Sequence, residues 1–257
     1  NNTNPKPSFL SRPLQDGDRY INNMAFFRNR LCLLSGDNVI CSRPGDYYNF
    51  WRSSALSLVN NDPIDLAVGT TGTSANATLY DSIEVSNGLL VFTSQEQFVL
   101  GTDSEVFGPR TARFARVGTY RYTGSEVREI TNPDKTVENI YRGAPVFSMG
   151  TTVGFTSNAG LNTRVLEMQE ISGRGEASVN ELTKPVSRLI PYGVNLITCS
   201  KDNQFLALSN RNTKNLWVYR YFDNDKERMQ SAWFRWTMLG EMIYMAIMDD
   251  VLWTVSI

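Results

Sequence analysis

Short apolar runs recur along this chain in pairs, with a polar turn between the two members of each pair. Runs of this length, bounded by Gly, Asn, Asp and Ser, are typical of β-strands joined as hairpins. Four complete pairs and the first run of a fifth can be followed, at residues 31–42, 89–100, 153–168, 205–221 and 251–257. The pattern therefore predicts a chain built from repeated two-strand units.

The first pair shows this signal most clearly. Residues 31–34 and 39–41 are apolar and flank the sequence Ser-Gly-Asp-Asn, in which Gly36 can adopt the positive φ of a tight turn. A two-residue turn that begins at Gly36 places Cys32 opposite Cys41, with both side chains on one face of the sheet. The two cysteines are then either a disulfide or a pair of small reduced core residues.

The spacing of the units favours a particular all-β architecture. The units are entered at Asn29, Asn87, Thr152, Asn203 and Asp250, which lie 58, 65, 51 and 47 residues apart. These intervals are close to the roughly 40 to 50 residues of a propeller blade once insertions are allowed for. We therefore expect an all-β fold, a β-propeller-like array of antiparallel sheets over residues 21–257. A β-sandwich is the alternative, because turn residues are dense along the chain. Helical patterning is scarce, and its best candidates are residues 176–187 and 223–231.

Length and composition agree with a globular chain of this kind. The 257 residues are 41% hydrophobic and 20% charged, which is ordinary for a folded domain. Residues 1–20, rich in Asn, Pro, Ser and Asp, lack any apolar period and predict a linker or a strap that lies on a neighbour. The net charge of −1 gives no basic excess for gripping nucleic acid. No apolar run is long enough to insert this segment into a membrane.

The absence of histidine restricts the chemistry that this chain can perform. It excludes Ser-His-Asp and Cys-His nucleophile systems and removes the commonest zinc ligand. The three cysteines, Cys32, Cys41 and Cys199, do not have metal-ligand spacing. Carboxylate-only reactions such as glycoside hydrolysis remain, and the candidate acids are Asp62, Asp65, Asp223, Asp225, Glu227, Asp249 and Asp250. We interpret these acids as turn or surface residues and expect no enzyme, cofactor or metal.

Two sets of side chains are candidates for binding. An arginine series interleaved with aromatic residues is a solvated strand face, a partner-contact surface or a DNA contact. Its members are Arg110, Arg113, Arg116, Arg121 and Arg128. The five tryptophans are expected to be core wedges between sheets, with a sugar-binding platform as the alternative; they are Trp51, Trp217, Trp233, Trp236 and Trp253.

Several motifs, in a fixed order, carry a family resemblance. Residues 26–42 read FFRNRLCLLSGDNVICS and lead into YYNFW at residues 47–51. The accompanying matches are NPKPSF at 4–9, DPID at 62–65, QEQFVL at 95–100, LWVYRY at 216–221 and QSAW at 230–233. This collinear set resembles the tail nozzle protein of short-tailed podovirus phages, also called tail tubular protein B. Residues 107–145 match the family poorly and are expected to be a variable insertion, and residues 177–191 also depart from it.

The resemblance implies a structural virion protein of the phage tail, assembled in the host cytoplasm. Its expected role is to extend the portal and adaptor, to form the DNA exit channel as a hexamer and to support tail-fibre attachment. The implied partners are other copies of itself, the portal-adaptor protein, a tail fibre protein and DNA that passes through the lumen without sequence-specific binding. Family members are several hundred residues longer, so we expect this chain to be a fragment. The alternative function is a carbohydrate-binding or carbohydrate-active β-propeller.

Overall fold

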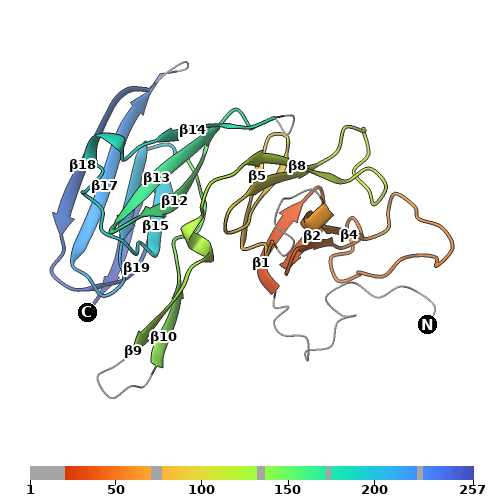
Figure 1. The fold of residues 1–257 in the computed structure, drawn as a ribbon, viewed down its shortest axis with the longest axis horizontal. Helices are drawn as coiled ribbons and strands as arrows, with labels where there is room; N and C mark the ends of the chain where they lie inside the picture. Colours follow the sequence, from red (N-terminus) through yellow and green to blue (C-terminus); the bar gives the residue numbers. More distant parts are fainter. Residues whose placement is uncertain (1–20, 71–76, 132–136, 172–174, 225–227) are drawn as a thin grey trace. The chain divides into compact units, whose positions relative to one another are not determined.

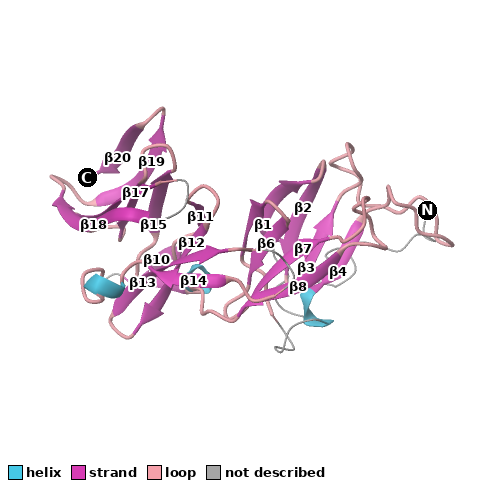
Figure 2. Cartoon of the chain, turned by 90° about the horizontal axis from the view of Figure 1, so that it is seen from above, coloured by secondary structure: helices cyan, strands magenta, loops and turns pink. Residues whose placement is uncertain are grey.

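The computed structural model describes residues 21–70, 77–131, 137–171, 175–224 and 228–257. In this part of the chain strands and loops dominate, and the helical turns are short 3-10 segments (Figure 2). The all-β prediction is therefore confirmed. The helical candidates were wrong: residues 176–187 hold strand β14 (Ser178–Glu181) and the 3-10 turn η4 (Lys184–Val186), and residues 223–231 cover the ends of two strands. The predicted linker or strap at 1–20 lies outside the described residues.

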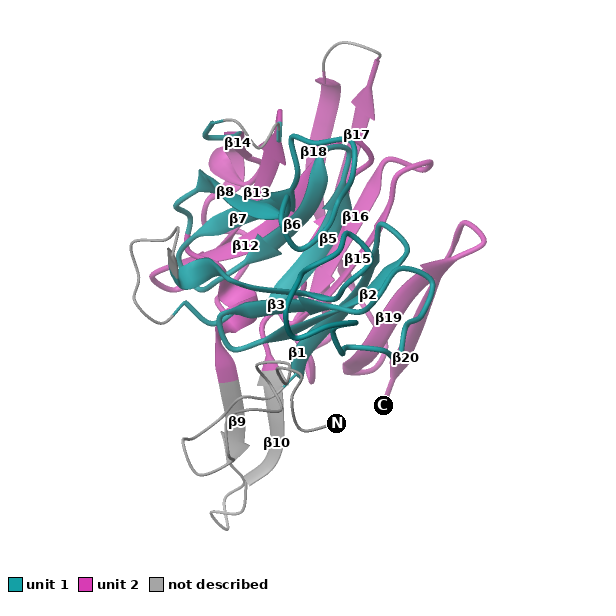
Figure 3. Cartoon of the chain, turned by 90° about the vertical axis from the view of Figure 1, so that its right-hand side faces the viewer, with its two compact units in different colours: residues 1–120, 171–177 teal, residues 121–170, 178–257 magenta. Residues whose placement is uncertain are grey.

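The chain divides into two compact units, coloured separately in Figure 3. Unit 1 comprises residues 1–120 and 171–177, and unit 2 comprises residues 121–170 and 178–257. The single propeller-like domain expected over residues 21–257 remains a prediction.

Unit 1 contains two four-stranded antiparallel sheets in which strands adjacent in sequence are also adjacent in the sheet. The first sheet consists of β1 (Ile21–Phe27), β2 (Arg30–Ser35), β3 (Asn38–Cys41) and β4 (Ile64–Ala67). The second consists of β5 (Asp81–Val85), β6 (Gly88–Phe92), β7 (Gln97–Gly101) and β8 (Arg113–Gly118). The 3-10 turn η2 (Val68–Thr70) follows β4 directly.

Unit 2 contains two more four-stranded sheets of the same topology and two hairpins. The sheets are β11 (Phe147–Ser148), β12 (Val153–Ala159), β13 (Asn162–Gln169) and β14, and β15 (Leu196–Ser200), β16 (Phe205–Ser209), β17 (Asn215–Asp223) and β18 (Arg228–Thr237). The hairpins are β9 (Val127–Thr131) with β10 (Val137–Arg142), and β19 (Met242–Met248) with β20 (Val251–Ser256). Figure 1 shows β9 and β10 projecting from the sheets of their unit, after the 3-10 turn η3 (Thr123–Ser125).

Each complete two-strand unit of the sequence pattern is the central pair of one of these sheets. The pairs are β2–β3, β6–β7, β12–β13 and β16–β17, and β20 is the predicted run at residues 251–257. The four-stranded meander is the topology of a propeller blade. No sheet closes into a barrel among the described residues. The propeller arrangement of the sheets around one axis remains a prediction.

The central strands are apolar because both of their faces are covered. In unit 1, Cys32 and Leu34 of the first sheet pack in one cluster with Leu89 and Phe98 of the second. In unit 2 the sheet β15–β18 lies between two clusters: Leu206 and neighbours face β11–β14, and other apolar side chains of the sheet face the hairpin β19–β20. Face-to-face packing of twisted sheets thus forms the core of each unit.

Candidate assembly surfaces

The long loop between β3 and β4, residues 42–63, is held in place by the buried side chain of Arg30. Only 1% of Arg30 is exposed. Its guanidinium donates hydrogen bonds to the carbonyl oxygens of Ser42 (2.7 Å) and Asp62 (2.8 Å), and also to that of Asn60 (2.9 Å). Burial lowers the pKa of Arg30, and these three carbonyl oxygens compensate part of the lost hydration. One cation therefore ties both ends of the loop to β2.

Asp62 holds the middle of the same loop from the inside. Its carboxylate is fully buried and accepts hydrogen bonds from the backbone N–H of Ser53 (2.8 Å), the hydroxyl of Ser53 (2.6 Å) and the backbone N–H of Val59 (2.9 Å). Burial alone would raise the pKa of Asp62, but these hydrogen bonds and the nearby charge of Arg43 outweigh it and lower the pKa. Asp62 is thus a structural anchor, as its interpretation as a turn-shaping acid predicted.

The loop anchored in this way presents apolar side chains to solvent. We call these residues the loop surface: Tyr47, Tyr48, Trp51, Leu56 and Val59, with Phe26 of β1. The ring of Phe26 packs edge-on against that of Tyr47, with 5.4 Å between the ring centroids. Tyr48 is 91% exposed and Leu56 is 98% exposed. Arg30 and Asp62 are buried charges that fix this loop, yet the apolar side chains of the loop point outward. The stability of unit 1 alone does not explain this arrangement. Such a surface is typical of a protein-interaction site.

A second apolar surface lies on the hairpin β19–β20 of unit 2. Cross-strand pairs on its outer face include Tyr244 with Val255 and Met248 with Val251. We call the outer apolar residues the hairpin surface: Tyr244, Met248, Val251, Trp253 and Val255, all between 51% and 57% exposed. The opposite face carries Met245 and packs on β15–β18. Both faces of this hairpin are therefore apolar, as in strands that are covered on two sides.

The turn of this hairpin explains two of the candidate acids. Asp249 and Asp250 join β19 to β20 and both have positive φ, 49° and 61°. Two left-handed residues in a two-residue connection form the type I′ turn that suits the twist of a hairpin, and Asp tolerates this conformation. Asp250 also accepts a hydrogen bond from Asn203 at 2.7 Å. The interpretation of these acids as turn residues is confirmed.

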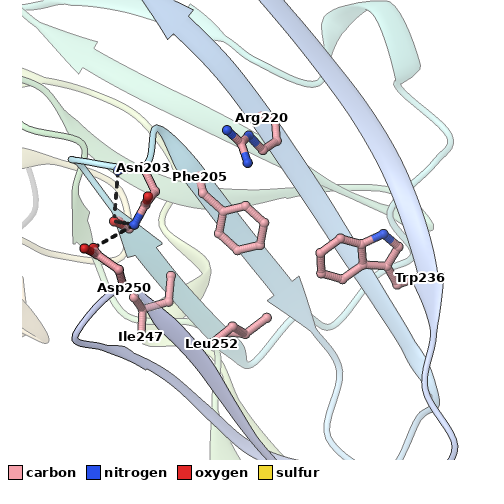
Figure 4. Close-up of a pocket in the computed structure, with 8 residues that line it drawn as sticks. Asn203, Phe205, Arg220, Trp236, Ile247, Asp250 and Leu252 are labelled. Carbon is pink, nitrogen blue, oxygen red and sulfur yellow. Dashed lines mark hydrogen bonds between the residues drawn. The ribbon is translucent and has the colours of Figure 1, made fainter.

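A small pocket lies beside this turn, between β15–β18 and β19–β20 (Figure 4). Its volume is about 210 Å³, below the roughly 300 to 1,000 Å³ of typical ligand sites. Phe205, Ile247, Leu252 and Trp236 provide apolar walls, and the residues that complete its lining are Ser200, Asn203, Arg220 and Asp250. Asp250 is the one carboxylate among these lining residues, so the pocket does not offer the pair of acids that glycoside hydrolysis requires.

A partly buried ion cluster links two sheets of unit 2. Arg228 of β18 donates two hydrogen bonds to Glu167 of β13 (2.8 and 3.0 Å) and two to Asp223 (2.7 and 2.9 Å). Its guanidinium also lies 4.5 Å from the ring centroid of Tyr221. Burial alone would lower the pKa of Arg228, but the two carboxylates reverse the effect and raise it. The candidate acid Asp223 is therefore an ion-pair partner, and this cluster was not identified from the sequence.

Asp65 is the one remaining candidate acid that the described residues include. Asp65 is exposed and accepts a hydrogen bond from Asn38 at 2.8 Å. Asp225 and Glu227 lie outside the described residues. Within the described ranges there is no group of three or more Cys, Asp or Glu side chains that could hold a metal ion. Within the same ranges the structure also lacks a helix with the length and apolar character to cross a membrane.

The arginine series does not form one strand face. Arg113 and Arg116 lie three residues apart on β8 of unit 1, and Arg121 belongs to unit 2. Three exposed arginines of the series form ion pairs: Arg113 with Asp103, Arg116 with Glu96 at 3.4 Å, and Arg121 with Glu126 at 2.9 Å. Arg110 is exposed in the loop before β8, and the side chain of Arg128 lies outside the described part of the structure. The partner-contact interpretation of this series remains a prediction.

The tryptophans divide between core and surface. Trp217 is 3% exposed and Trp233 is half-buried, as expected for core wedges. The prediction was wrong for Trp51, Trp236 and Trp253, which are 40%, 43% and 57% exposed. These three lie in a loop or on strands at the margin of a sheet, where one side of the indole has no covering layer.

Comparison with known proteins identifies the family of this all-β chain with its two apolar surfaces. Residues 1–256 match the family model described as bacteriophage nozzle protein. This chain belongs to the bacteriophage nozzle protein family. It is also similar to the tail tubular protein gp12 of Escherichia phage T7, with 32% identity over 235 residues, which are 91% of this chain and 26% of that protein.

Membership of the nozzle family confirms the resemblance inferred from the ordered motifs, and it identifies the protein as a structural component of the phage tail and thus of the virion. The chain spans about a quarter of the length of the curated relative it matches.

Proposed function

We propose that this nozzle-family protein is a ring-forming subunit that extends the portal and adaptor of a short tail, surrounds the DNA exit channel and supports tail-fibre attachment. The family match supports a role as a component of the tail. We expect the ring to be a hexamer. A ring needs a heterologous interface, in which one surface of a subunit meets a different surface of the next. The chain offers two different apolar surfaces, the loop surface in unit 1 and the hairpin surface in unit 2.

The observation that carries the proposal is the way the loop surface is built. Arg30 and Asp62 are both buried, and their hydrogen bonds fix a loop whose apolar side chains contribute little to the core of unit 1. Preorganising an exposed apolar surface reduces the conformational entropy lost when a partner binds. This arrangement is expected of a subunit that is complete only in an assembly.

The charges agree with a channel that DNA passes through without being held. The net charge of the chain is −1, and Arg113, Arg116 and Arg121 are each paired with an acid of their own unit. Binding to DNA releases counterions in proportion to the number of available cations. We therefore expect little retention on DNA and a weak dependence of any retention on salt.

Variants of the loop surface test the assembly role in the full-length protein. Tyr48→Ser and Leu56→Ser together remove the most exposed apolar side chains of the loop surface. The fold should therefore be retained while ring assembly and infectivity fall by tenfold or more. The matched control is Leu161→Ser, at an 85% exposed position in the β12–β13 turn, which should assemble normally. Assembly is measured by sedimentation with the portal-adaptor ring, and infectivity by complementation of a phage that lacks the protein.

Two outcomes would contradict this function. Normal rings and full infectivity for the double variant would show that the loop surface is not an interface. An electron-microscopy map of the intact tail that places this segment in the capsid shell or at a fibre tip would refute the nozzle role. The same map would also show whether a further sheet of the same polypeptide or a neighbouring subunit covers the hairpin surface.

A carbohydrate-binding propeller is the second candidate, favoured by the exposed indoles of Trp51, Trp236 and Trp253. Exposed aromatic rings can stack on sugar faces. Binding of host polysaccharide that is lost in Trp51→Ala would support it, whereas assembly with a portal-adaptor ring in the absence of such binding would favour the nozzle role.

A further inference from the structure

The two cysteines of the first sheet are directly opposite each other in its two central strands. Cys32 of β2 pairs with Cys41 of β3, as the sequence predicted, around a turn in which Gly36 has φ 58°. Both side chains are completely buried, and their Sγ atoms lie 2.7 Å apart. Both are free thiols. The structure therefore brings together a pair of thiols with no intervening group.

The hydrogen bonds of the ladder show which kind of cross-strand position this is. The N–H of Ser42 donates to the carbonyl oxygen of Leu31 at 2.8 Å, so these neighbours form a hydrogen-bonded pair. Pairs alternate along an antiparallel ladder, so Cys32 and Cys41 occupy a non-hydrogen-bonded position, where Cα atoms are about 4.5 Å apart. Disulfides usually have Cα–Cα distances of about 4.4 to 6.8 Å. A disulfide can thus form here without moving the strands.

We propose that Cys32 and Cys41 are an oxidation site that closes to an intrasheet disulfide once the tail leaves the reducing host cytosol. The oxidant is a small-molecule disulfide such as glutathione disulfide. One thiolate attacks it and releases one glutathione thiolate, and the second protein thiolate then displaces the other glutathione. The S–S bond forms, the protein loses two electrons, and the two cysteine protons end on the two glutathione thiols.

The surroundings of the pair determine how quickly it reacts and how long the product lasts. Burial raises the pKa of the Cys41 thiol, and the nearby Arg30 guanidinium opposes this only in part. Reaction therefore requires a transient opening of the sheet and should be slow in the folded protein. The same burial keeps reductants away from the finished disulfide. Oxidation would then be a late and persistent event that fastens the two strands next to the Arg30 anchor.

The site is tested by incubating the folded chain with glutathione disulfide, followed by denaturing alkylation and mass spectrometry. The reduced protein should take up three alkyl groups, one for each cysteine, and the oxidised protein should take up one, on Cys199. No Lys or Arg lies between Cys32 and Cys41, so trypsin leaves both cysteines in one peptide. Because trypsin does not cut between Arg43 and Pro44, this peptide is residues 31–52. That peptide should resist alkylation until a reductant is added.

Three variants make the test decisive. Cys199→Ser should still lose both of its remaining alkylation sites on oxidation, whereas Cys32→Ala and Cys41→Ala should retain theirs. Oxidation should lower the unfolding constant of unit 1 by up to about a hundredfold, because it closes a short loop in the unfolded chain. Two results would overturn the proposal. One is the uptake of three alkyl groups by wild-type protein that was unfolded, refolded and exposed to glutathione disulfide. The other is a stable glutathione adduct on Cys32 or Cys41. Since neither readout uses assembly, failure here is distinguishable from failure of the nozzle role.

Discussion

Replacing Arg228 by methionine is the sharpest test of how unit 2 is held together. The variant Arg228→Met keeps a long apolar side chain but removes four hydrogen bonds to Glu167 and Asp223. Asp223 is 35% exposed, so water screens its ion pair with Arg228, which contributes at most about 1 kcal/mol to the free energy of unfolding. Glu167 is 1% exposed and would be left as a buried carboxylate without its cation, at a cost of about 2 to 4 kcal/mol. The expected loss in the free energy of unfolding is about 3 kcal/mol.

Tryptophan fluorescence during denaturant unfolding can follow unit 2 selectively. Trp51 is the single tryptophan of unit 1, so a Trp51→Phe background leaves only reporters in unit 2. The matched control is Arg235→Met, at an exposed position of the same strand, which should change the stability by less than about 0.5 kcal/mol. Removing both partners of the buried pair with Arg228→Met and Glu167→Met should cost much less than the sum of the single variants, because no unpaired charge remains.

Two results would refute this reasoning. A stability loss below about 1 kcal/mol for Arg228→Met would mean that the cluster is solvated like a surface ion pair. Additive losses in the double variant would mean that the two side chains act through independent packing contacts.

Two other predictions concern unit 1. In Asp62→Asn the amide nitrogen would face hydrogen-bond donors, so a loss of about 1 to 3 kcal/mol is expected at neutral pH. Because the folded-state pKa of Asp62 is lowered, its contribution to the free energy of unfolding is present above the unfolded-state pKa and is lost as the pH falls through the folded-state pKa. Denaturant titrations in which the stability difference between wild type and Asp62→Asn grows toward acid pH would contradict this. Gly88→Ala should destabilise by about 2 kcal/mol or more, because a Cβ there would collide with the carbonyl oxygen of Leu100. Gly175→Ala, where the Cβ would meet open space, is the control in thermal melts, and equal melting temperatures would refute the clash.

The sequence predicted the central strands because those segments are apolar on both faces. In β16 all five residues, Phe205–Ser209, are buried, and in the sequence this strand is a continuous apolar run between turns. The outer strands were harder to recognise, since one side is exposed and their pattern is mixed: β14 reads Ser-Val-Asn-Glu and has no fully buried residue. The long strand β18 begins with Arg228, Met229 and Gln230, residue types that favour helix. Its pairing with β17 over nine positions outweighs that local preference.

The candidate surfaces could be predicted only in part. The turn roles of Asp62 and Asp249 followed from their local sequence, and the pairing of Cys32 with Cys41 followed from the position of the turn. The ion cluster could not be found, because Arg228 and Glu167 are 61 residues apart and neither lies in a recognisable motif. The exposure of Trp253 was missed for a related reason: whether an apolar strand is covered depends on which other sheet packs against it.

The meander order of the four large sheets has a consequence for how such a protein is made. Every strand in them pairs with the strand just before or after it in the chain. Contacts between near neighbours in sequence require little loop closure and form early. During synthesis each four-stranded layer can therefore fold soon after it leaves the ribosome and can serve as a template for the next one. A phage that produces many copies of a long tail protein in a short infection would benefit, because nascent chains would expose unpaired strand edges only briefly.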